Sequence, residues 1–208
     1  SFYTKKINKS NLIKGDKIYI ILAGTHLYNF IAQYALKGSQ IINTYNSLKQ
    51  LNTLPQKIKN KIRFRLHPGS KEWDMEKRVK FDFDNSAICK YKKIDDSFLN
   101  ASILINIDFQ TAFYESMYSQ KPVIVFADRK LTNNINPKIK KLFEKFIEQK
   151  IIIGNINDLL SHINNISENP LKWWNSEPIK TLRDEFSYLC SKKDDENFIK
   201  EITALKKK

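Results

Sequence analysis

Four polar side chains, Asp108, Gln110, Thr111 and Glu115, follow an apolar segment at residues 102–107. If Thr111 opens a helix, Glu115 lies one turn further along on the same face. A hydroxyl and free backbone N–H groups at a helix start suit a phosphate, and a carboxylate one turn deeper suits a ribose diol. The spacing therefore indicates a nucleotide site. Two alternatives stay open, because Thr111 or Asp108 could simply cap the helix and Glu115 could form a surface ion pair.

A second group of polar side chains lies in the segment Arg63-Phe-Arg65-Leu-His67-Pro68-Gly69. Strand alternation places Arg63, Arg65 and His67 on one side, and Pro68 fixes the turn that follows. Cations and an imidazole at a strand end favour contact of His67, and also of Arg65, with an anionic group. The alternative is that the arginines pair with surface carboxylates and that His67 makes a backbone hydrogen bond.

A third segment, Gly24-Thr25-His26, lies where an apolar run hands over to a helical pattern. A glycine at this point allows a ligand to approach the backbone closely, although a simple tight turn explains it equally well. His26 is the candidate for a general base near this edge. Arg129, which follows another apolar run, is a candidate for offsetting charge on a phosphate.

The sequence predicts no metal site and no cofactor. Asp82-Phe83-Asp84 has the letters of a metal-binding DxD motif, but it sits in a charged segment and not at a strand end. Cys89 and Cys190 are 101 positions apart and lack metal-ligand spacing, so we expect free thiols in a reducing cytosol.

These candidate residues depend on an alternation of strands and helices. Short apolar runs predict parallel strands at 18–24, 62–67, 102–107, 122–127 and 151–153. Helical spacing predicts helices over 25–37, closed by Gly38, and over 40–51, 137–149, 157–167 and 178–190, with a short strand at 87–91 and a short helix at 95–101. The pattern indicates an α/β fold, a Rossmann-like doubly wound parallel sheet, in which loops after strands converge at one edge.

The domain organisation follows from the same pattern. Residues 1–16 are polar and basic and are expected to be a lead-in or interdomain linker. Residues 17–190 are expected to form one Rossmann-like nucleotide-binding domain, and residues 191–208 a C-terminal helix and basic tail. A chain of 208 residues is large enough for one such domain with a sizeable core.

The composition limits the partners and the location. Apolar residues make up 41% of the chain, but no run approaches the roughly 18 residues of a membrane span. We expect a cytoplasmic protein, since the start lacks the apolar core of a secretory signal. The net charge of +14 comes mostly from scattered lysines, and no nucleic-acid-binding motif is visible, so no specific nucleic acid is predicted. A solvated lysine-rich surface is the first interpretation, and attraction to an anionic membrane surface at the inner membrane face is the alternative.

A strand ending in His67-Pro68, a later Thr111-x-x-x-Glu115 on a helix between strands, and the segment 121–126, KPVIVF, together resemble the donor half of a GT-B glycosyltransferase. The pattern is similar to bacterial polysialyl, capsule Kdo and teichoic-acid polymerising transferases. The tail, with Gly154, a helix and then KWWNS at 172–176, also resembles a family of bacterial surface-carbohydrate transferases first named from a leptospiral locus.

The resemblance implies a function. In those families the HP histidine and the Ser/Thr motif contact the donor nucleotide, which would place His67, Thr111 and Glu115 in metal-independent donor binding, with His67 stabilising the leaving group. Gln110 departs from the families that have Ser or Thr there. The reaction implied is transfer of a sugar from a nucleotide-sugar donor to a surface glycan or protein acceptor, with an N-terminal acceptor domain expected upstream of Ser1. A nucleotide-sugar epimerase and a nucleotide-binding module without catalysis remain alternatives.

Overall fold

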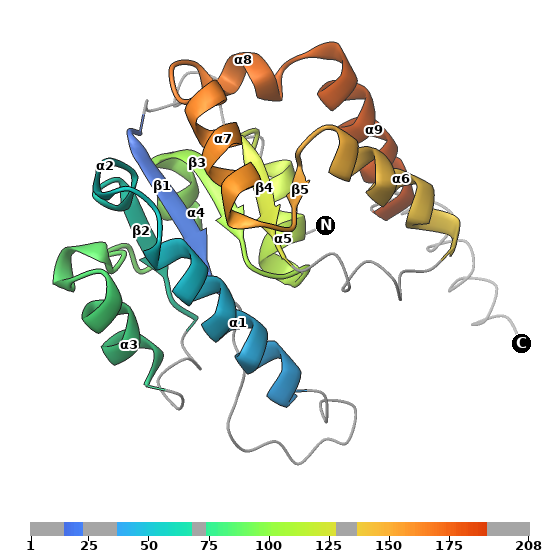
Figure 1. Cartoon of the computed structure of the whole chain (residues 1–208). Coiled ribbons are helices and arrows are strands. Elements are labelled where there is room, and N and C mark those ends of the chain that lie inside the picture. The colour runs from blue at the N-terminus through green and yellow to red at the C-terminus, as the bar shows by residue number, and fades with distance from the viewer. Residues whose placement is uncertain (1–14, 23–36, 68–73, 128–136, 191–208) are drawn as a thin grey trace, which may run out of the picture.

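The computed structural model describes residues 15–22, 37–67, 74–127 and 137–190, and these form one parallel sheet covered by helices on both faces (Figure 1). The strands are β1 (Lys17–Ile21), β2 (Ile62–Arg65), β3 (Ala101–Asn106), β4 (Val123–Phe126) and β5 (Ile152–Ile153). Their order is β2-β1-β3-β4-β5, and every neighbouring pair is parallel. The predicted α/β fold is confirmed.

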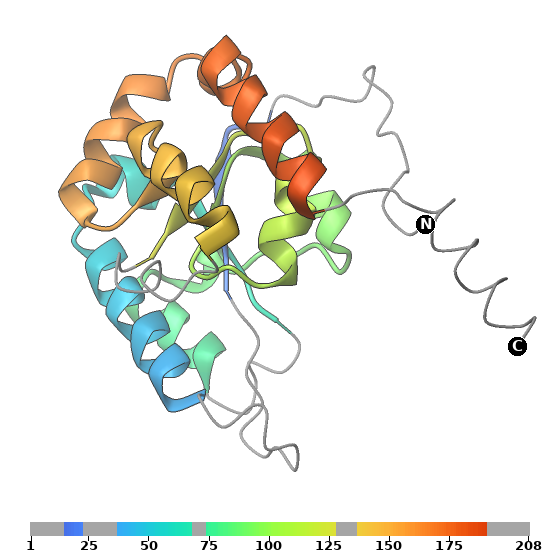
Figure 2. The same cartoon turned by 90° about the vertical axis from the view of Figure 1, so that its right-hand side faces the viewer.

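The helices are α1 (Lys37–Asn52), α2 (Gln56–Lys59), α3 (Met75–Asp82), α4 (Ile94–Leu99), α5 (Thr111–Tyr118), α6 (Pro137–Glu148), α7 (Ile156–Ile166), α8 (Pro170–Trp174) and α9 (Glu177–Cys190). A 3₁₀ turn, η4 (Asn85–Ala87), precedes α4. Side chains of α1, α2, α3 and α7 pack on one face of the sheet, and those of α4, α5, α6, α8 and α9 pack on the other. Figure 2 shows the sheet nearly edge-on between these two layers.

The continuous apolar runs of the strands explain the two layers. In β3, Ile103 and Ile105 belong to one hydrophobic core, whereas Leu104 between them belongs to the other. A strand buried on both faces needs apolar residues at every position, so it loses the alternation of a half-exposed strand. The same reasoning holds for β4, in which all four residues are buried.

Two local predictions are wrong. The segment 87–91 forms only an isolated bridge between Ile88 and Phe64, because the chain turns towards α4 after one ladder bond, from Cys89 N to the Phe64 carbonyl at 2.9 Å. Gly38 does not close a helix, since α1 begins at Lys37 and places Gly38 in its first turn. Helix α7 is capped by Asn155, whose side chain accepts a hydrogen bond from the Asp158 amide at 2.8 Å.

Candidate functional site

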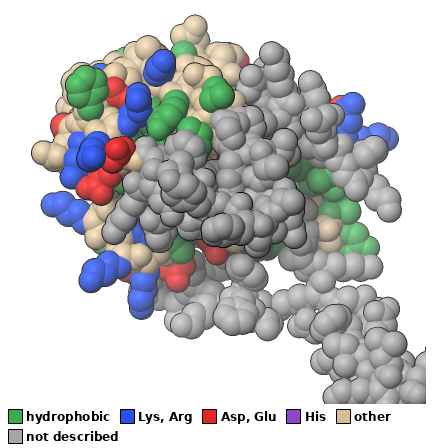
Figure 3. Space-filling view, turned by 90° about the horizontal axis from the view of Figure 1, so that it is seen from below, with side chains coloured by type: hydrophobic (Ala, Val, Ile, Leu, Met, Phe, Trp, Pro, Cys, Tyr) green, Lys and Arg blue, Asp and Glu red, His purple; other side chains and the backbone are tan. Residues whose placement is uncertain are grey.

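The sheet has a switch point at β1. From β1 the chain crosses to β2 on one side of it, and it later returns to β3 on the other side. Open α/β sheets bind ligands at the carboxyl ends of their strands, at the point where the strand order reverses direction. A cavity of about 100 Å³ lies at this point. Its lining consists of Ile21, Leu22, His67, Asn106, Asp108, Gln110, Thr111 and Ala112. Figure 3 views the molecule from this edge and shows lysine and arginine side chains on its left, with a few carboxylates among them.

The cavity brings together His67, Asp108, Gln110 and Thr111 from two separate segments. His67 follows β2 and Asp108 follows β3, and both strands pair with β1. The carboxyl ends of all three strands therefore meet at one edge. Among the other predicted residues, Glu115 and Arg65 do not line this cavity. Gly24, Thr25, His26 and Arg129 lie outside the described residues.

Asp108 organises the loop between β3 and α5. Its Oδ1 accepts a hydrogen bond from the Phe109 amide at 2.6 Å, and its Oδ2 accepts one from Gln110 Nε2 at 3.3 Å. Burial raises the pKa of the Asp108 carboxyl above its ordinary value, and the two hydrogen bonds oppose this shift. The loop thus presents a partly desolvated acid to the cavity.

Helix α5 begins at the cavity without a side-chain cap. Gln110 is the N-cap residue, with an extended backbone and no hydrogen bond from its side chain to the helix amides. The Phe113 amide is satisfied by the Gln110 carbonyl at 2.8 Å, whereas the amides of Thr111 and Ala112 have no carbonyl one turn earlier in the helix. Two cavity-lining residues therefore offer backbone donors at the positive end of the helix dipole, which suits an anionic group.

Asn106, a residue that the sequence interpretation missed, lines the same cavity although it is only 1% exposed. Its Nδ2 donates to Ser116 Oγ at 2.9 Å, and that hydroxyl donates to the Phe113 carbonyl at 2.8 Å. Among the described residues, nothing donates to Asn106 Oδ1. The signal in the sequence was a polar residue at the last position of the strand, directly after the three apolar residues 103–105.

Glu115 lies on α5, one turn beyond Thr111, and it is half-buried. Burial raises the pKa of the Glu115 carboxyl, and the negative charge of Asp95 in α4 adds to the shift. Its electrostatic neighbour is thus on α4, which packs on the same face of the sheet as α5.

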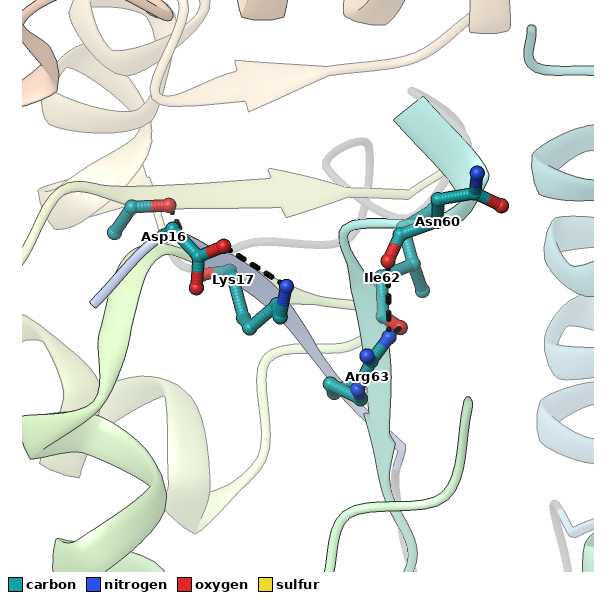
Figure 4. A network of polar contacts seen from close by, with 6 residues as sticks. Asp16, Lys17, Asn60, Ile62 and Arg63 are labelled. Carbon is teal, nitrogen blue, oxygen red and sulfur yellow. Dashed lines mark hydrogen bonds and ion pairs between the residues drawn. The ribbon is translucent and has the colours of Figure 1, made fainter. Parts of the chain in front are cut away.

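The two arginines of β2 bind backbone carbonyls. The Arg65 guanidinium donates to the carbonyls of Tyr91 and Lys92, the latter at 2.7 Å, and so fixes the segment that leads into α4. Arg63 donates to the carbonyls of Asn60 and Ile62 at 3.1 and 2.6 Å (Figure 4). In this arrangement Arg65 positions a neighbouring segment and does not point its donors at the cavity residues.

A larger cavity, of about 360 Å³, opens at the opposite edge beside the amino ends of β1, β3 and β4. Its lining mixes apolar side chains with Asp16, Lys61, Lys121 and Glu168. We place the site at the smaller cavity, because parallel sheets bind ligands at the carboxyl ends of their strands. Within the described ranges, no three His, Cys, Asp or Glu side chains are grouped so that they could hold a metal ion.

The fold and the cavity define an α/β protein with a pocket at the switch point of a parallel sheet, lined by both polar and apolar residues. The sequence matches the family model described as LIC12162 family transferase over residues 1–202, and the chain belongs to this transferase family. No curated protein matches the sequence. None of the described helices is both long enough and apolar enough to cross a membrane.

Proposed function

We propose that this chain binds the nucleotide-sugar donor of a glycosyl transfer reaction, as the donor half of a metal-independent GT-B enzyme. The observation that carries the proposal is the cavity shared by His67 and the uncapped start of α5 at Thr111. The family match supports the transferase class, and the resemblance of the central motifs supports the glycosyl donor. The acceptor, a surface glycan or a protein, would be presented by a second domain.

The described residues supply charge stabilisation for such a reaction. When the bond between the anomeric carbon and the phosphate oxygen breaks, the electron pair stays on the nucleotide phosphate, and the acceptor oxygen forms the new bond while its proton passes to a base. The Thr111 hydroxyl, the first amides of α5 and the His67 imidazole would stabilise the negative charge on that phosphate. Arg129, Gly24 and Thr25 remain predicted donor contacts, and His26 remains a candidate for the base.

The size of the cavity fits only one group of the donor. Pockets that enclose whole small ligands have volumes of roughly 300–1,000 Å³. The described cavity has about 100 Å³, which suits a phosphate or one ring. We therefore expect the isolated chain to bind nucleotide weakly and to transfer sugar inefficiently, because it supplies only part of the contacts and does not orient an acceptor.

Titration calorimetry with CMP, CDP, UDP and GDP tests the proposal. We expect one of the four to bind and Thr111→Val to weaken that binding by about 0.5–1.5 kcal/mol, since the variant removes a hydroxyl and keeps the shape. Thr181→Val is the matched control, because Thr181 lies on α9 and its hydroxyl bonds the Glu177 carbonyl at 3.0 Å. No binding by any of the four nucleotides would refute the proposal.

Glu115→Ala tests the ribose contact that the family resemblance implies. If Glu115 holds the ribose, the variant should weaken nucleotide binding by roughly 1–3 kcal/mol, the range for stranding hydrogen-bond partners. Glu144→Ala on α6 serves as the control, since Glu144 is exposed. An affinity unchanged by Glu115→Ala would remove Glu115 from the site and leave it a structural role between α5 and α4.

A further inference from the structure

The amide of Asn106 has one orientation in the structure. The Ser116 hydroxyl gives its single proton to the Phe113 carbonyl, so it can only accept from Asn106, and the Asn106 Nδ2 must face it. The Oδ1 atom is thereby turned away from Ser116, and no donor in the described part of the chain reaches it.

An unpaired acceptor that is buried lowers the stability of the fold, so the presence of Asn106 at the end of β3 calls for an explanation. Its neighbours Ile105 and Ile107 are buried and apolar, and a leucine of similar shape would avoid the cost of the unpaired oxygen. Because Asn106 lines the cavity, the missing partner can be supplied by a ligand that binds there.

Asp108, two positions after Asn106, lines the same cavity and adds further acceptors. Each of its oxygens accepts one hydrogen bond within the loop, which leaves lone pairs for other donors. A phosphate placed against this carboxylate would be repelled, whereas a hydroxyl would be attracted. Asn106 and Asp108, which we call the floor of the cavity, therefore accept hydrogen bonds, and the first amides of α5 donate them.

We infer that Asn106 and Asp108 accept hydrogen bonds from the ribose hydroxyls of a ribonucleotide whose phosphate lies at the start of α5. The inference rests on the proposed function, and it assigns the ribose to these two residues instead of Glu115. A vicinal diol supplies two donors to the floor, and a deoxygenated sugar supplies none. The site thus selects ribonucleotides.

The test compares the best-binding nucleotide of the four with its 2′,3′-dideoxy form, by titration calorimetry on the full chain. We expect the wild-type chain to bind the dideoxy form about tenfold more weakly, or worse, because the floor acceptors stay unpaired. Asn106→Leu should shrink this ratio to roughly threefold or less, mainly by weakening the ribonucleotide. Asp108→Asn, which keeps the side-chain shape, should shrink it as well. Asn164→Leu, at an exposed position of α7, should leave it unchanged.

The outcomes separate the inference from the proposed function. Equal wild-type affinity for both forms would overturn the inference and leave nucleotide binding intact, whereas no binding of any nucleotide would overturn the proposed function. The inference would also be overturned if Glu115→Ala abolished the preference for the ribonucleotide over its dideoxy form while Asn106→Leu and Asp108→Asn both left that preference unchanged. If circular dichroism shows that Asn106→Leu does not fold, the test rests on Asp108→Asn alone. An unchanged ratio of ribonucleotide to dideoxynucleotide affinity in that variant then counts against the inference.

Discussion

Replacing Phe113 with alanine should lower the free energy of unfolding by about 3–5 kcal/mol, the cost of removing a buried phenyl ring and leaving a cavity. Phe113 is 0% exposed and lies on α5, one turn from the cavity. Its ring packs against those of Phe109 and Phe186, with centroid distances of 5.4 and 5.5 Å. Urea denaturation followed by circular dichroism measures the change.

Phe81→Ala is the matched control for Phe113→Ala, because it removes the same ring from a position on α3 that is 90% exposed. We expect this variant to stay within about 0.5 kcal/mol of the wild-type chain. Similar losses in both variants would mean that Phe113 is not a core residue and that α5 is held in some other way. Phe113 also anchors the helix that carries Thr111, so its loss should weaken nucleotide binding.

The stability of the protein should fall by roughly 3 kcal/mol as the pH decreases from about 6.5 to about 4, because of His162. Burial lowers the pKa of this imidazole to about 4, and the positive charge of Lys150 adds to the shift. In the unfolded chain the imidazole takes up its proton near its ordinary pKa of 6.5. Between pH 4 and pH 6.5, protonation of His162 therefore favours the unfolded state. The stability that neutral His162 contributes is fully present only above its unfolded pKa of 6.5.

His162→Leu tests this pH dependence. The imidazole lies edge-on to Trp173, with ring centroids 4.7 Å apart, and its Nε2 is without a hydrogen-bond partner in the described part of the chain. A leucine cannot titrate, so the variant should lose less stability than the wild-type chain over this range. Carboxylates contribute equally to both proteins and cancel in the comparison. Parallel curves of unfolding free energy against pH would contradict the prediction.

The fold was predictable because continuous apolar runs separated by amphipathic segments admit few other arrangements. The shared cavity of His67 and Thr111 follows from the same rule, since both come directly after parallel strands. Arg65 was harder to interpret, because its acceptors are the carbonyls of residues 91 and 92, and no local pattern reveals them. The buried position of Asn106 depends likewise on a partner in the next helix.

His162 could have been recognised as buried from the sequence. A polar imidazole on a helix far from the predicted site suggests a surface residue, yet His162 shares a helical face with Leu159, Ile163 and Ile166 at spacings of three and four. All four side chains are buried. For a polar residue within an apolar helical stripe, the spacing to its apolar neighbours therefore predicts burial better than its charge does.

Every described residue that lines the cavity shared by His67 and Thr111 precedes β4. The first three strands and the start of α5 thus carry this pocket, while β4, β5 and the later helices complete the sheet and its two cores. In evolutionary terms, we expect the two portions to be under different selection. Substitutions within β4, β5 and α6 to α9 should alter how much folded protein a cell accumulates, whereas substitutions among the residues that line this pocket should alter the binding of its ligand. A mutant library aimed at new ligand preference would therefore concentrate on the pocket-lining positions among residues 21–112.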